Sequence, residues 1–87
     1  SLLHELVILQ LPAGTVAGSV GVGADRKADE GASRGEASKS CSSGPGAGLM
    51  SGATGWVTVA LQPGAYAVIC NEPGHYTSGM RAQFLVR

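Results

Sequence analysis

Three side chains with soft or borderline metal donors lie close together near the C-terminal end of the sequence. Cys70, His75 and Met80 supply a thiol, an imidazole and a thioether at the spacing C-x4-H-x4-M. Mixed sulfur and nitrogen donors suit copper better than magnesium or calcium, which prefer oxygen ligands. The spacing therefore predicts a copper site built largely from one loop.

The second histidine of the chain, His4, lies in an apolar stretch near the other end. A lone histidine at the start of a strand is more often structural than a metal ligand. Beside the downstream motif, however, it completes a set of two imidazoles, one thiolate and one thioether, which is the ligand set of blue-copper electron-transfer sites. We therefore predict that one copper ion is held by His4, Cys70, His75 and Met80.

Four residues beside the ligands are predicted to shape the surroundings of the metal: Glu5, Asn71, Pro73 and Gly74. The backbone N–H of Glu5 is the candidate hydrogen-bond donor to the sulfur of Cys70. Pro73 has no N–H that could point at the sulfur. Gly74 directly precedes a ligand, where the backbone must turn tightly.

Length and charge limit the classes of function. The chain of 87 residues is sufficient for one small domain, spanning 1–87. Its formal net charge of zero argues against nucleic acid as a partner, because no basic patch is present to neutralise phosphates. No apolar run is long enough to span a membrane, and no signal peptide is visible. The chain opens in a strand-like run without a starting methionine, so we expect a fragment of a longer precursor.

Four stretches alternate apolar and polar residues or are rich in branched ones, and we predict strands over 2–11, 56–61, 65–70 and 81–87. The first stretch is apolar on both faces, which predicts a central strand. Short strands with turns between them, and no convincing helix, predict an all-β fold of the antiparallel sandwich type.

The stretch 13–55 has a different composition. It holds eleven of the fourteen glycines and eight of the twelve charged residues. We predict a long, mobile Gly/Ser-rich loop over the surface, with at most a short edge strand at 18–23. Because surface loops tolerate change, we expect this stretch to be dispensable for copper binding.

The two cysteines allow a competing interpretation, a single disulfide in a secreted domain. Cys41 lies in a stretch of serine and glycine without strand character, whereas Cys70 ends an apolar strand. A disulfide would consume the thiolate that copper needs. We favour separate roles, with Cys41 an incidental loop thiol.

Three segments resemble the small blue-copper proteins of the plastocyanin/azurin superfamily, the cupredoxins. Residues 63–70 resemble their P-G-x-Y-x-x-x-C strand, and 70–80 resemble the C-x-x-P-G-H-x-x-x-G-M loop of sulfocyanin- and rusticyanin-like members. Residues 4–7 resemble the strand that brings their first histidine. The resemblance covers 1–12 and 55–87, and it does not include the middle loop.

The resemblance implies a cupredoxin-like domain: a Greek-key antiparallel β-sandwich with one copper ion. It also implies an extracytoplasmic location (periplasm, cell envelope or secreted) and single-electron transfer between redox proteins of the cytochrome or oxidase type. Family members place two strands before the first histidine. We therefore expect this chain to lack the N-terminal strands of the sandwich.

Two other classes of function compete with an electron carrier. A copper-binding module for trafficking or sensing would use the same ligands without needing fast transfer. A zinc or cysteine enzyme is disfavoured, because no oxyanion-stabilising constellation is apparent and methionine is not among the usual zinc ligands. We therefore predict a protein that is not an enzyme.

Overall fold

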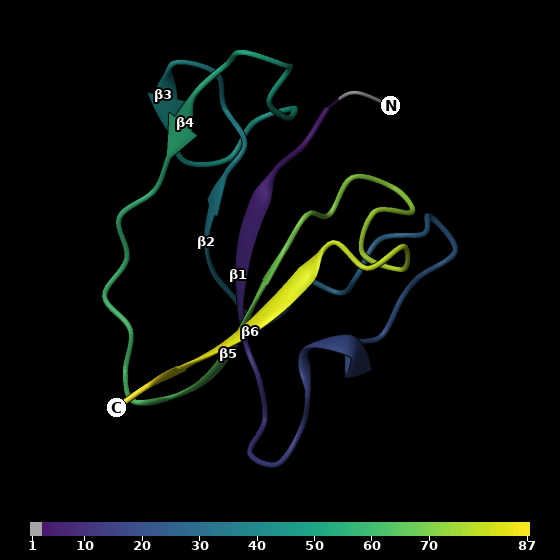
Figure 1. Cartoon of the computed structure of the whole chain (residues 1–87), viewed down its shortest axis with the longest axis vertical. Coiled ribbons are helices and arrows are strands. Elements are labelled where there is room, and N and C mark those ends of the chain that lie inside the picture. The colour runs from purple at the N-terminus through teal and green to yellow at the C-terminus, as the bar shows by residue number, and fades with distance from the viewer. Residues whose placement is uncertain (1–2) are drawn as a thin grey trace.

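The computed structural model describes residues 3–87 and is mostly β-structure (Figure 1). Its main sheet has four antiparallel strands in the spatial order β2-β1-β5-β6. The bounds of these strands are Leu6–Gln10 for β1, Ser33–Ala37 for β2, Gly64–Ile69 for β5 and Arg81–Val86 for β6. This arrangement confirms an antiparallel sheet as the main element of the fold.

Strand β1 is central, as the sequence predicts, because β2 pairs with one of its edges and β5 with the other. Val7 and Leu9 are buried on the same face. The branched residues of β1 favour the extended backbone, and Pro12 follows shortly after the strand ends. The strand is shorter than predicted, and the predicted start at Leu2 lies outside the described residues.

A small parallel sheet and a short helix complete the regular structure. Strands β3 (Ser42–Ser43) and β4 (Gly55–Trp56) pair with each other, and a 3-10 helix, η1, spans Ala17–Ser19. No helix within residues 3–87 is long and apolar enough to cross a membrane.

The expectation that 13–55 forms only a surface loop is wrong for residues 33–37. These residues form β2 and pair with β1, although serine, arginine, glycine and glutamate rarely favour strands. The apolar strand β1 needs a partner on this edge, and this tertiary context overrides local propensity. Gly35 is required there, because an added Cβ would lie 2.5 Å from the Cγ1 atom of Val59.

The predicted strand 56–61 is only partly present, since β4 ends at Trp56. The alternation nevertheless remains in the burial pattern: Val57, Val59 and Leu61 are half-buried, whereas Thr58 and Ala60 are exposed. Val57 and Val59 pack against Gly35 of β2. This segment therefore lies against the main sheet without joining its hydrogen bonds.

The hydrophobic core lies on the other face of the sheet. Val7, Leu9, Ala67 and Ile69 contribute to it from β1 and β5. The residues that cover them come from outside the sheet, and they are Leu11, Ala17, Ala28 and Tyr76. The stretch that follows β1 and the loop between β5 and β6 therefore pack together on this face.

Candidate metal centre

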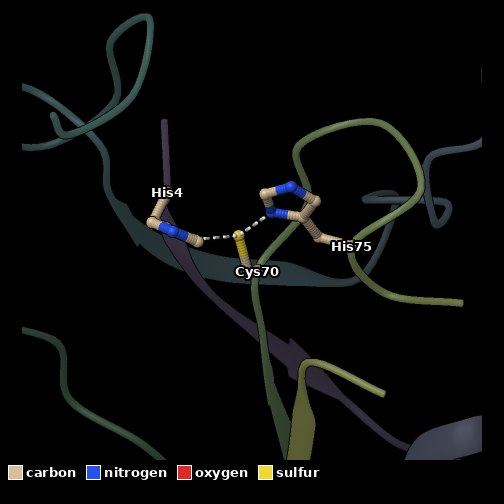
Figure 2. A group of neighbouring side chains, drawn as sticks. All are labelled: His4, Cys70 and His75. Carbon is tan, nitrogen blue, oxygen red and sulfur yellow. Dashed lines mark hydrogen bonds between the residues drawn. The ribbon is translucent and has the colours of Figure 1, made fainter. Parts of the chain in front are cut away.

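Three of the four predicted ligands converge. The Sγ atom of Cys70 lies 3.2 Å from Nδ1 of His75 and 3.8 Å from Nδ1 of His4. Figure 2 shows both imidazole rings beside the sulfur, and the centroids of the two rings lie 5.1 Å apart. One ligand atom from each residue lies within 4.8 Å of the other two, so this group can hold a metal ion.

The distances suit a first-row metal ion bound to all three side chains. Metal–thiolate bonds of about 2.3 Å and metal–imidazole bonds of about 2.0 Å, at trigonal or tetrahedral angles, separate sulfur from nitrogen by roughly 3.5–3.8 Å. The observed separations of 3.2 and 3.8 Å are close to that range. Small side-chain adjustments would bring both imidazoles into bonding distance.

Two distant parts of the chain position these ligands. His4 precedes β1, and its backbone forms an antiparallel bridge with Leu49 through two hydrogen bonds of 2.9 and 2.6 Å. Cys70 directly follows β5, and its N–H donates to the carbonyl of Met80 (3.0 Å) where the sheet pairing ends. His75 lies in the loop between β5 and β6, which we call the ligand loop (residues 70–80).

The surroundings of the thiol agree with one specific prediction. The backbone N–H of Glu5 donates to Sγ of Cys70 with a separation of 3.4 Å. Cys70 is only 5% exposed, whereas His4 is exposed and His75 is half-buried. The sulfur is therefore shielded from water and receives a hydrogen bond, and one imidazole remains open to solvent.

The carboxyl group of Glu5 also lies in an unusual environment. Partial burial, which is the largest cause, and the nearby carboxylates of Glu36, Glu72 and Glu30 together raise its pKa from 4.5 to about 7. Burial disfavours the ionised carboxylate, and like charges disfavour it as well. A cation bound beside Glu5 would oppose both effects and favour ionisation.

The backbone of Met80 lies beside the three ligands. Its carbonyl accepts from Cys70, and its N–H donates to the carbonyl of His75 (3.1 Å). Met80 and Cys70 also line one shallow depression of about 270 Å³, which is open to solvent. The thioether as weak axial ligand stays a prediction.

Gly74 and Gly79, which precede His75 and Met80, adopt a backbone conformation that other residues rarely take. Gly74 has a φ of 81° and Gly79 a φ of 102°. A Cβ at Gly74 would also lie 3.3 Å from Nη1 of Arg26. The tight turn predicted at Gly74 is therefore present. Pro73 is exposed, and its predicted influence on the sulfur stays a prediction.

Asn71 directly follows the ligand Cys70, and its side chain forms hydrogen bonds with a distant segment that the sequence does not predict. Its side chain is fully buried and exchanges two hydrogen bonds with the backbone of Ala28. Its amide also donates to the carboxylate of Glu30 (2.7 Å).

Tyr76 is not among the predicted site residues, yet it is 2% exposed and hydrogen-bonded to the same stretch of chain that holds Ala28. Its hydroxyl donates to the carbonyl of Ala17 and accepts from the N–H of Val20. Nothing in the local pattern around Tyr76 shows that its hydroxyl reaches so distant a segment.

Both cysteines are free: Cys41 is exposed and Cys70 is buried. Cys41 lies immediately before β3, and its N–H donates to the carbonyl of Thr54. Its thiol is therefore available as an internal comparison for experiments on Cys70.

Comparison with known proteins identifies no relative, because no family model, curated protein or solved structure matches the chain. The donor atoms and their geometry are therefore the evidence for function. A thiolate with two imidazoles selects soft or borderline ions such as copper and zinc over hard cations.

Proposed function

We propose that this protein is a mononuclear type 1 copper protein that carries single electrons between redox proteins. The observation that supports the proposal most strongly is the convergence of Sγ of Cys70 with Nδ1 of His4 and His75. A trigonal Cys/His/His set with a weak axial methionine is typical of copper sites that transfer electrons. Copper, when bound, supplies a one-electron couple between its two ionic states.

The residues of this chain would keep electron transfer fast by holding the donor atoms in fixed positions. The backbone bridge at Leu49 anchors His4, and the sheet end at Met80 anchors Cys70. Burial of the Cys70 sulfur limits the access of water, and the Glu5 N–H gives it a fixed hydrogen-bond partner. A site that changes little between oxidation states needs little reorganisation during transfer.

We further propose that the sheet is part of a cupredoxin-like Greek-key sandwich, with an extracytoplasmic location and cytochrome- or oxidase-type partners. The support is the central place of β1 between β2 and β5, together with the motif of the ligand loop.

Copper trafficking or sensing is the second candidate function. The exposure of His4 favours it, because a solvent-exposed ligand can leave the metal easily during transfer to another protein. The two functions differ in how strongly the thiolate is bonded to copper(II). A short, covalent copper–thiolate bond produces intense visible absorption, and a tetragonal complex with nitrogen and oxygen donors does not.

The test is the visible absorption spectrum of the copper(II)-loaded protein. We expect an intense blue colour that Cys70→Ser abolishes and that the matched variant Cys41→Ser retains. A colourless or faintly coloured complex in the unsubstituted protein would contradict the electron carrier and favour trafficking. Blue colour that persists in Cys70→Ser would contradict the assignment of the thiolate.

A further inference from the structure

His75 differs from the other two ligands in how its backbone is held. The backbone of His4 is bridged to Leu49, and that of Cys70 continues the β5–β6 pairing by one more hydrogen bond, to Met80. The backbone N–H of His75 donates to Glu72, and its carbonyl accepts from Ser78 and Met80. All of these partners lie in the ligand loop itself, so the position of His75 depends on what holds that loop.

Both neighbours of His75 in the sequence are tied to a distant stretch, residues 17–30, which we call the clamp segment. The N–H of Gly74 donates to the carbonyl of Arg26 with a separation of 2.9 Å. The hydroxyl of Tyr76 donates to the carbonyl of Ala17 (2.5 Å) and accepts from the N–H of Val20 (3.1 Å). His75 therefore lies between two attachment points on the clamp segment.

Asn71 adds a third attachment at the start of the loop. Its Oδ1 accepts from the N–H of Ala28 (2.7 Å), and its Nδ2 donates to the carbonyl of the same residue (2.9 Å). Nδ2 also donates to Glu30. Asn71 is fully buried and Tyr76 nearly so, and hydrogen bonds that are shielded from water are costly to leave unmade.

We propose that Asn71 and Tyr76 are positioning residues that fix His75 by fastening the ligand loop to the clamp segment. This inference rests on the proposed function only in treating His75 as a metal ligand. It also reverses the expectation that 13–55 is dispensable for copper binding, because residues 17–30 supply the partners of both side chains. The geometry of the site would then depend on a segment that contributes no ligand.

The matched pair of variants is Tyr76→Phe and Tyr66→Phe. Both tyrosines are buried, and each loses one hydroxyl that donates to a backbone carbonyl. The hydroxyl of Tyr66 bonds to Gln62, at the end of β5 away from the ligands. Phenylalanine at 76 keeps the ring that the Arg81 guanidinium covers at 5.5 Å, so only the bonds to Ala17 and Val20 are lost.

The first measurement uses the metal-free protein and hydrogen exchange of the backbone amides of Gly79 and Met80, which bond within the loop. We expect Tyr76→Phe to exchange roughly five- to tenfold faster than Tyr66→Phe at these amides, as the loss of a buried hydrogen bond implies. Asn71→Ala should act in the same direction. Equal exchange in the two tyrosine variants would overturn the proposal, even if both were destabilised.

The second measurement is cobalt(II) titration, followed by the thiolate-to-cobalt absorption. We expect Tyr76→Phe to weaken cobalt affinity several-fold and to shift the spectrum, and Tyr66→Phe to leave both unchanged. Unchanged affinity and spectrum in Tyr76→Phe would overturn the positioning role. If copper(II) gives no blue colour but the exchange and cobalt results are as expected, the proposed electron-carrier function is wrong. The positioning role of Asn71 and Tyr76 is then still supported.

Discussion

The backbone nitrogen of Glu5 lies 3.4 Å from the sulfur of Cys70, although the two residues are 65 positions apart in the sequence. This hydrogen bond joins the entry of β1 to the end of β5. The positive end of the N–H dipole points at the thiolate and reduces the electron density that the sulfur can give to copper. It should therefore disfavour the oxidised ion and raise the reduction potential.

Replacing Glu5 by proline tests this relationship, because proline has no N–H. We expect Glu5→Pro to lower the reduction potential by on the order of 60 mV, the one-electron equivalent of a tenfold change in the equilibrium constant. Glu5→Gln is the control, since it removes the carboxyl and keeps the N–H. Redox titration giving the same potential for both variants would contradict the role of the N–H.

The role of Met80 can be tested by a series of substitutions. If its thioether is a weak axial ligand, Met80→Leu should keep copper and raise the potential, because a donor to copper(II) is lost. Met80→Gln should keep copper and lower the potential, because a harder oxygen donor favours the oxidised ion. From highest to lowest, the predicted order of reduction potentials is Met80→Leu, the unsubstituted protein and Met80→Gln. Equal potentials in the three proteins would place Met80 outside the coordination sphere.

The raised pKa of Glu5 predicts a pH dependence of stability in the metal-free protein. The folded carboxyl titrates near 7 and the unfolded one near 4.5, so between these values the folded state holds a proton that unfolding releases. Stability should therefore fall as pH rises from about 4.5 to about 7 and then level off. Denaturation midpoints measured with a chelator present should fall less with rising pH in Glu5→Gln than in the unsubstituted protein. The same dependence of the midpoint on pH in both proteins would contradict the role of the Glu5 carboxyl.

Gly35 provides a test of the packing between β2 and residues 57–61. An added Cβ would meet Val59 at 2.5 Å, so we expect Gly35→Ala to lower the free energy of unfolding by about 1–3 kcal/mol, as overpacking typically does. Gly21→Ala is the matched control, because a Cβ there has no neighbour within 4 Å. Urea denaturation in which the two variants lose equal stability would contradict this contact.

The sequence predicts the central strand β1, the strands β5 and β6 and the pairing of Cys70 with His75, because apolar alternation and donor spacing are local signals. His4 lies 66 positions from Cys70, and only the completion of the donor set predicts that it joins them. It misses β2, whose composition does not favour a strand, because the pairing partner and not propensity determines that structure. It also misses the partners of Asn71 and Tyr76. Those side chains form hydrogen bonds with backbone atoms of residues 17–30. Every residue type except proline offers the same backbone groups, so the sequence does not indicate such partners.

The central claim is that His4, Cys70 and His75 bind one copper ion. The most direct measurement is a crystal structure of the copper-loaded protein, with anomalous diffraction collected at the copper edge. We predict one copper peak bonded to Sγ of Cys70 and to Nδ1 of both histidines. A copper peak that lacks the Cys70 sulfur or either imidazole among its ligands would contradict the claim.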